Sequence, residues 1–279
     1  MNLAPRRQRG MTLIELLVAI ALGLLLLAGI LQVFAASRQS YRVQQNTARM
    51  QENALIAVEI LQRSVREAGF EPPPTAIVQL ACTSVSATDC ALAGSDNVAS
   101  GTASAVTGSD MLVVRIRSDG NMSDCQGEAI AYNVISGSTG NTTNDSFRVG
   151  GTDTTNPPSL RCGRAASTTA PWGQPLVDDI EDMQILYGLS DSSGTVFVPA
   201  SALTTTTRWN AVTAVRIQLC ARSPDANVVP VADTQTCRMD TNSDGLLSDT
   251  DTLRPSATPN DGRLRRVVTT TVTLRNRIR

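Results

Sequence analysis

The chain has 279 residues, a formal net charge of −1 and 42% hydrophobic residues. That length allows one sizeable core with a small additional segment. Histidine and lysine are both absent, which removes the usual general base, the imidazole metal ligand and the lysines of phosphate loops and Schiff bases. The chain also has no basic excess that would neutralise a nucleic-acid backbone. We therefore expect a protein that is not an enzyme and has no direct nucleic-acid partner.

The N-terminal segment joins arginines to a long apolar run. Three arginines precede Gly10, and apolar residues then dominate from residue 11 to residue 31. About 20 such residues cross a ~30 Å hydrocarbon core as a helix. The arginines are expected to stay on the cytoplasmic side, so the C-terminus lies outside.

An ordinary secretory signal is the alternative, because Val33-Phe34-Ala35 offers a small-residue cleavage site behind the run. Two features oppose that interpretation. The run is longer than the ~7–15 apolar residues of a secretory signal, and Glu15 lies just inside its cytoplasmic edge. A carboxylate in a membrane segment is costly and is therefore usually functional.

Residues 10–15, Gly-Met-Thr-Leu-Ile-Glu, resemble the prepilin-peptidase motif of type IV pilins and type II secretion pseudopilins. The resemblance implies cleavage after Gly10, methylation of Met11 as the new N-terminus, and an assembly role for Glu15. In that role Glu15 pairs with the α-amino group of a neighbouring subunit, and loss of one partner of such a buried pair costs about 3–5 kcal/mol. Most major pilins begin with phenylalanine, so Met11 favours a minor pilin.

Helical periodicity continues beyond the membrane segment. Apolar residues recur at three- and four-residue steps at Met50, Ala54, Val58, Leu61, Val65 and Ala68. This stripe is predicted to pack in a core, and Gly69 followed by prolines 72–74 is predicted to end the helix. The predicted segments are a cytoplasmic leader at 1–10, a transmembrane helix at 11–36, the periplasmic half of that helix at 37–71 and a β-rich head at 72–279.

The head is predicted to consist of short strands joined by long loops. Segments typical of half-buried strands lie at 111–117, 129–135, 180–187, 212–220 and 264–274. Stretches rich in Ser, Thr, Gly and Asn are predicted to be surface loops at 94–109, 136–159 and 201–208. Strands that follow one long helix predict an α+β fold with the helix packed on an antiparallel sheet. A solvated sheet edge, not a catalytic carboxylate pair, is the interpretation of Asp178, Asp179, Glu181 and Asp182.

All six cysteines follow the apolar segment, and none forms a Cys-x-x-Cys pair. An even set in an exported head predicts disulfides. Sequence neighbours meet most readily, so the expected pairs are Cys82 with Cys90, Cys125 with Cys162, and Cys220 with Cys237.

Residues 240–251 follow the spacing of an EF-hand calcium loop, with Gly245 at the turn position. The candidate ligands for a structural Ca2+ are Asp240, Asn242, Asp244, the Leu246 carbonyl, Ser248 and Asp251. Asp251 is shorter than the glutamate usual at the last position, and no EF-hand helix flanks the loop. A plain loop of Asx turns is the alternative, and the sequence leaves both interpretations open.

Parts of the head resemble the PilW family of type IV pilus minor pilins. The resemblance rests on residues 108–115, 176–188, 209–217 and 272–276. It implies a type IV pilin-like fold and a role in priming pilus assembly and in the tip complex, which supports adhesion, twitching motility and DNA uptake. The implied partners are other minor pilins, the major pilin, the prepilin peptidase, the inner-membrane assembly platform and a tip adhesin.

The implied location is the inner membrane, crossed once, with a periplasmic head that lies at the pilus tip after assembly. A type II secretion minor pseudopilin is the alternative within the same superfamily. A signal-anchored periplasmic enzyme is the alternative from another class.

Overall fold

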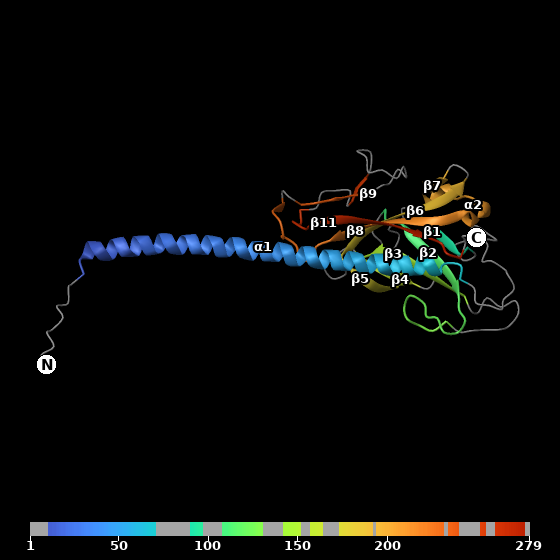
Figure 1. Cartoon of the computed structure of the whole chain (residues 1–279), viewed down its shortest axis with the longest axis horizontal. Coiled ribbons are helices and arrows are strands. Elements are labelled where there is room, and N and C mark those ends of the chain that lie inside the picture. The colour runs from blue at the N-terminus through green and yellow to red at the C-terminus, as the bar shows by residue number, and fades with distance from the viewer. Residues whose placement is uncertain are drawn as a thin grey trace. The chain divides into compact units, whose positions relative to one another are not determined.

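The computed structural model describes residues 11–70, 90–96, 108–130, 142–151, 157–163, 173–191, 194–231, 234–239, 252–254 and 260–276 (Figure 1). The chain divides into two compact units, residues 1–45 and residues 46–279. Helix α1, Leu13–Glu67, contributes to both. The second unit is the head, and it includes the last turns of α1 as well as all the strands.

Helix α1 ends at Glu67, and two residues later Gly69 adopts a φ of 72°. Glycine takes this left-handed conformation without the steric cost of a Cβ, so the predicted helix end is confirmed. After the helix the chain is hydrogen-bonded to strand β2, Met111–Arg117. The Gly69 N–H donates to the Arg115 carbonyl at 2.9 Å, and the Arg117 N–H donates to the Phe70 carbonyl at 3.0 Å.

The first sheet of the head has five antiparallel strands in the order β1-β2-β3-β4-β5. The strands are β1 Leu92–Ser95, β2 Met111–Arg117, β3 Thr142–Gly150, β4 Ser159–Gly163 and β5 Gln174–Asp178. Leu112 pairs with Phe147, and both side chains are fully buried. The strand predicted at 111–117 is confirmed. Of the strand predicted at 129–135, Ala129 forms an isolated bridge with Ser123, and residues 131–135 lie outside the described residues.

The loop predicted at 136–159 is wrong in its centre, because β3 occupies residues 142–150 and lies between β2 and β4. Its composition is polar, but Asp145 and Ser146 have hydrogen-bond partners inside the fold. Asp145 accepts from the Cys125 N–H at 3.0 Å, and the Ser146 hydroxyl donates to the Gly163 carbonyl at 3.0 Å. Buried polar groups with such partners are tolerated in a strand.

The second sheet has four antiparallel strands in the order β11-β8-β6-β7. The strands are β6 Ile180–Asp191, β7 Gly194–Val198, β8 Val212–Arg222 and β11 Arg265–Thr273. The strands predicted at 180–187, 212–220 and 264–274 are therefore confirmed. In the central strand β6, Met183, Ile185 and Tyr187 alternate with buried Gln184 and Leu186, so both faces of this strand are covered.

Two short helices and a two-stranded ribbon complete the head. They are η1 Ala200–Ala202, α2 Thr206–Asn210, β9 Cys237–Met239 and β10 Thr252–Arg254. The loop predicted at 201–208 is corrected here. Thr205 caps α2 by accepting from the Arg208 N–H at 3.3 Å, and Trp209 is buried.

Within the head, the second half of α1 runs along the strands (Figure 1). All six residues of the predicted stripe are buried, together with Asn46 and Ala57. Helix side chains also bond to the sheet, as Gln62 donates to the Thr270 hydroxyl at 2.6 Å. The predicted α+β fold, a long helix on antiparallel strands, is confirmed.

Candidate functional site

The first turn of α1 positions the residues that the sequence assigns to processing and assembly. Gly10 lies outside the described residues, and Met11 is 69% exposed at the start of the described chain. The Glu15 N–H donates to the Thr12 hydroxyl oxygen at 3.3 Å. In return, the Thr12 N–H donates to the Glu15 carboxylate at 3.3 Å. This reciprocal arrangement is a capping box, which satisfies backbone groups that a helix start otherwise leaves open.

The interpretation of Glu15 as a partner for another subunit did not include this contact. The Thr-x-x-Glu spacing that signals a capping box is visible at residues 12–15. Thr12 is thus a residue at the start of α1 that the sequence reasoning missed. Its hydroxyl also lies 3.3 Å from the Glu15 carboxylate, so Glu15 has a partner inside its own chain.

The first half of α1 keeps its apolar side chains on the outside. An apolar window of this helix is long enough to cross a membrane, and no residue of that window is buried within the chain. Leu13, Leu26 and Ile30 are each more than 60% exposed. An exposed apolar surface of this size is expected only where lipid or another protein covers it.

A half-buried cluster of arginines and carboxylates joins β6, β8 and β11 in the head. Arg265, whose side chain is 1% exposed, donates to the Glu181 carboxylate at 2.6 Å and 2.9 Å. Arg265 also reaches Asp261 at 2.6 Å. The Arg222 guanidinium forms ion pairs with the carboxylates of Asp179, at 3.1 Å, and of Glu181, at 3.3 Å. We call these five residues the arginine–carboxylate cluster.

The cluster corrects the interpretation of 178–182 as a solvated edge. Only Asp178 is exposed, whereas Asp179 and Asp182 are buried. Asp182 accepts from the Met183 N–H at 2.7 Å. The acidic run is a corner between β5 and β6, where Asp179 has a φ of 63°. Asp179 and Glu181 pair with arginines more than 40 positions later, which sequence spacing does not reveal.

Burial and pairing move the pKa values of this cluster in different directions. Burial raises the pKa of Asp179 above 3.8, even though Arg222 pulls it down. Burial also acts to raise the pKa of Asp261, but the hydrogen bonds from Arg265 and Arg263 outweigh it and lower the pKa below 3.8. Burial alone would lower the pKa of Arg265, yet Asp261 and Glu181 raise it. Arg265 therefore stays charged.

Two disulfides have the pairing expected from the sequence. Cys125 is bonded to Cys162, with Cα atoms 6.2 Å apart, and Cys220 is bonded to Cys237, with Cα atoms 5.8 Å apart. Cys90 is also disulfide-bonded, while its expected partner Cys82 lies outside the described residues. The bond from Cys220 attaches the β9–β10 ribbon to β8.

The calcium-like segment 240–251 lies outside the described residues, and with it all six candidate ligands. The strands on either side of it are described. Met239 pairs with Thr252, and Cys237 pairs with Arg254. The ladder therefore holds the two ends of this segment together. Among the described residues, no group of three or more acidic, cysteine or histidine side chains is arranged to hold a metal ion.

An exposed apolar helix with a capped first turn, followed by an α+β head on its second half, defines a pilin-like protein. Residues 5–31 match the family model described as Prokaryotic N-terminal methylation motif, and residues 146–276 match that described as Type IV Pilus-assembly protein W. Together the two ranges cover more than half of the chain. The match over residues 146–276 agrees with the resemblance to the PilW family of type IV pilus-assembly proteins, and the match over residues 5–31 agrees with the prepilin signal.

A type IV-like pilin from Thermus thermophilus is a similar solved structure, with 15% sequence identity and a TM-score of 0.39. That similarity covers 83% of this chain and 100% of the other. No curated protein matches the chain. The methylation motif and the apolar helix together make the chain a membrane-anchored, single-pass protein.

Proposed function

We propose that this chain is a minor pilin that helps to prime type IV pilus assembly and joins the complex at the pilus tip. The observation that carries the proposal is the first half of α1, an apolar helix that its own head does not bury and that has Glu15 in its first turn. Such a helix is suited first to the membrane and then to a bundle of similar helices. The matched pilus-assembly family supports this role.

The capping box gives Glu15 a partner before assembly. In the membrane-bound subunit the Thr12 N–H and hydroxyl satisfy the carboxylate, which lowers the cost of holding it near the apolar segment. In the filament, the α-amino group of a neighbouring Met11 supplies a positive charge. Glu15 then exchanges a local partner for one on another subunit, and the exchange favours assembly.

The test compares two glutamates of the same helix. Glu15→Ala is expected to lower incorporation into sheared pili at least tenfold while the membrane-bound amount stays the same. Glu59→Ala changes an exposed glutamate in the head and is expected to have no effect. The measurement is immunoblotting of pilus and membrane fractions. Normal incorporation of the Glu15→Ala protein would remove the assembly role.

A second variant separates pairing from capping. Thr12→Ala breaks the capping box, at a cost of about 0.5–2 kcal/mol for loss of an N-cap, but leaves the carboxylate available to a neighbour. We expect it to reduce incorporation far less than Glu15→Ala does. Equal defects in the two variants would assign Glu15 to capping alone.

Processing is the first step of the proposed pathway. A prepilin peptidase would cut after Gly10 and leave the apolar helix attached, and Gly10→Val is expected to block that cut. Mass spectrometry of the membrane fraction should find methylated Met11 in the wild-type chain and the uncut leader in the variant. A soluble head beginning near Ala36 would instead identify an ordinary signal peptide.

The proposed partners are other minor pilins, the major pilin, the inner-membrane assembly platform and a tip adhesin. The proposed location is the inner membrane with the head in the periplasm, then the pilus tip, where the chain would support adhesion, twitching motility and DNA uptake without catalysis. Deletion of the gene should abolish twitching. A loss of protein secretion with pili intact would point to a type II secretion pseudopilin instead.

We also propose that residues 240–251 bind calcium as a structural ion. The spacing of Asp240, Asn242 and Asp244 supports this, as does the pairing of Met239 with Thr252, which brings the loop ends together. Calcium at 100 times its Kd would stabilise the fold by about 2.7 kcal/mol. The melting temperature of the full chain should therefore rise with calcium. An Asp240→Ala, Asp244→Ala double variant with the same calcium response would refute the site.

A further inference from the structure

Strand β11 forms one edge of the second sheet. Its Val267 side chain packs against Cys237 and Met239 of β9, and beyond that point the strand lacks the usual protection of an edge. Among the strands that the structure describes, it pairs only with β8, in an unbroken register from Arg265 to Thr273. Edge strands usually carry charges, prolines or bulges that prevent another strand from adding. From Val267 to Thr273 the strand consists only of valine and threonine, two residue types that favour β structure.

The hydrogen bonds at the two ends of β11 show which backbone groups point away from β8. The Leu264 carbonyl accepts from the Ser223 N–H at 2.8 Å, and the Leu274 N–H donates to the Thr213 carbonyl at 2.9 Å. Even-numbered residues therefore bond toward β8. The Arg265 N–H instead donates to the Gln235 side chain at 3.3 Å, so odd-numbered residues point outward.

The outward residues along the open part of β11 are Val267, Thr269, Thr271 and Thr273. Their N–H and C=O groups have no hydrogen-bond partner among the residues that the structure describes. In an antiparallel ladder, the backbone N–H and C=O groups of every second residue point to the same edge of the strand. These outward groups therefore repeat at the spacing that an added strand needs. The open edge is therefore a template for pairing along four outward positions.

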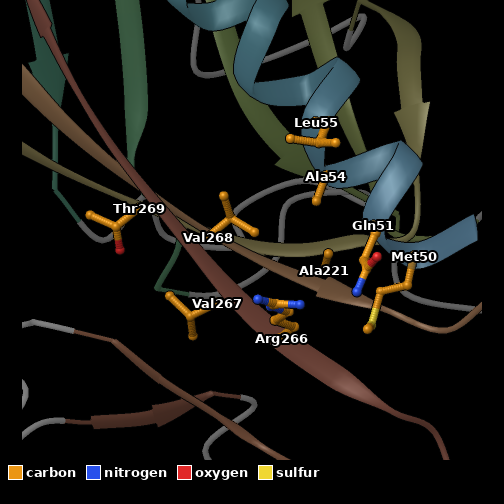
Figure 2. A pocket seen from close by; sticks show the side chains of 9 residues that line it. All are labelled: Met50, Gln51, Ala54, Leu55, Ala221, Arg266, Val267, Val268 and Thr269. Carbon is orange, nitrogen blue, oxygen red and sulfur yellow. The ribbon is translucent and has the colours of Figure 1, made fainter. Parts of the chain in front are cut away.

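A groove of about 430 Å³ lies beside this edge, between α1 and β11 (Figure 2). Leu55 of α1, 65% exposed, stands on one side, and Val268 of β11 stands on the other. Val268 points to the same face of the sheet as Thr270, which accepts the bond from Gln62 of α1. The groove can thus receive side chains that a strand on the β11 edge would direct toward α1.

Arg266 is the one charged residue among those that line the groove. Its side chain is exposed, and no ion pair is seen for it among the described residues. An occupant that carries an acidic side chain at this point would pair with Arg266. A second copy of this edge would bring another arginine-bearing strand, which offers no such complement.

We propose that the open edge of β11 and the groove beside it bind an extended segment of a partner protein, which adds to the sheet as a further strand. The segment has apolar side chains toward Leu55 and Val268 and an acidic side chain toward Arg266. An extended segment, unlike a docked helix, bonds the outward N–H and C=O groups of β11. The inference does not depend on the pilus role of the chain.

The test uses the full-length chain in detergent micelles with its disulfides intact. The probe is a fluorescent nine-residue peptide of alternating valine and threonine in which one central valine is replaced by glutamate. A sister peptide carries arginine at the same place. We expect saturable binding of the glutamate peptide by fluorescence anisotropy, weaker binding of the sister peptide, and slower amide exchange at Val267 and Thr269 but not at Val268.

Three variants define the site. Thr269→Pro removes an outward N–H that takes no part in the β8 ladder, and it should weaken peptide binding at least tenfold. Arg266→Glu should reverse the preference between the two peptides. Leu55→Glu should weaken binding at least fivefold, whereas Val196→Glu, which alters an exposed valine on the opposite edge strand β7, should leave binding unchanged.

Several outcomes would overturn the proposal. These are the absence of saturable binding, equal binding in the Leu55→Glu and Val196→Glu chains, and protection of amides in α1 instead of β11. A dimer of the chain that Thr269→Pro dissociates would assign the edge to a second copy instead. If Thr269→Pro fails to fold, Arg266→Glu and Leu55→Glu still decide, since both replace exposed side chains.

Discussion

The two halves of α1 use the same kinds of apolar residue for different purposes. In residues 13–45, leucine and isoleucine side chains are exposed around the helix, and none of the apolar window is buried. In residues 46–67, the apolar side chains of one stripe are buried, and Leu61 is fully covered. One continuous helix therefore has one half stabilised by its own head and another half that needs lipid or other helices around it.

The largest expected effect separates these halves directly. Leu61→Ala should lower the stability of the head by about 3–5 kcal/mol, because it removes a fully buried side chain and leaves a cavity. Leu17→Ala, at a position 58% exposed, should change head stability by less than about 0.5 kcal/mol. Thermal melting of both full-length variants in detergent checks the pair. Equal losses would mean that the first half also packs on its own chain.

The next effect concerns how the head holds its charges. Arg265→Ala leaves Glu181 and Asp261 without their closest cation, and it should cost about 3 kcal/mol, the lower end for a broken buried pair. Arg63→Ala removes an exposed pair between neighbouring helix turns, with Arg63 80% exposed. That loss should be at most about 0.5 kcal/mol. Denaturant unfolding of both variants would contradict this account if their losses were similar.

The head and the first half of α1 differ in how much space surrounds their glycines. A Cβ on Gly94 of β1 would lie 1.9 Å from the Tyr187 hydroxyl oxygen and 2.9 Å from the Met111 carbonyl oxygen, whereas a Cβ on Gly23 of α1 would meet nothing within 4 Å. Gly94→Ala should therefore lower the stability of the head by about 1–3 kcal/mol. Gly23→Ala should leave the stability of the head unchanged.

Removal of the Tyr187 hydroxyl should rescue part of that loss. The Tyr187→Phe, Gly94→Ala double variant is expected to melt above the Gly94→Ala single variant, since phenylalanine lacks the hydroxyl oxygen that makes the closest contact. A melting temperature that does not recover would assign the clash to the two atoms that remain 2.9 Å away, the Met111 carbonyl oxygen and the Cζ of residue 187.

The smallest expected effect is a change in the pH dependence of head stability. The pKa of Asp261 is lower in the folded head than its ordinary value of 3.8, so the unfolded chain binds the proton first as the pH falls. The stability that the ionised Asp261 contributes to the head is present above about pH 4 and is lost as the pH falls below that value. Asp261→Asn should therefore flatten the acid limb of a plot of stability against pH.

Asp179 supplies the matched control, because its folded pKa is raised above 3.8. The stability that Asp179 contributes depends on pH in the opposite direction. It is present below pH 3.8 and is lost as the pH rises through the pKa of Asp179 in the folded head. Asp179→Asn should therefore steepen the acid limb that Asp261→Asn flattens. Melting temperatures from pH 2.5 to pH 7 would contradict the account if both variants changed the slope in the same direction.

Local patterns predicted much of the fold. The stripe from Met50 to Ala68 and the helix end at Gly69 follow from three- and four-residue spacing and from one glycine, and three strands of the second sheet follow from alternation or apolar runs. Strand β3 was missed because its polar residues resemble a loop. Two of them, Asp145 and Ser146, bond to the backbone of Cys125 and Gly163, which lie 20 and 17 positions away in sequence.

The candidate site was predictable only in part. The processing motif and Glu15 were visible because they form a short linear pattern, and the Cys125–Cys162 and Cys220–Cys237 bonds followed from the order of the cysteines in the sequence. The arginine–carboxylate cluster was not, because Glu181 and Arg265 are 84 positions apart and meet only through the register of β6, β8 and β11. The role of Thr12 was readable from its spacing to Glu15.

The last residues of the chain complete the end of its first helix. The Asn276 side chain donates to the Ala68 carbonyl at 3.0 Å, and Thr270 of β11 receives the bond from Gln62. Both contacts span 208 positions, so they form only after nearly the whole chain has left the ribosome. Biosynthesis thus sets the order of folding, in which α1 is made first but acquires its final neighbours last.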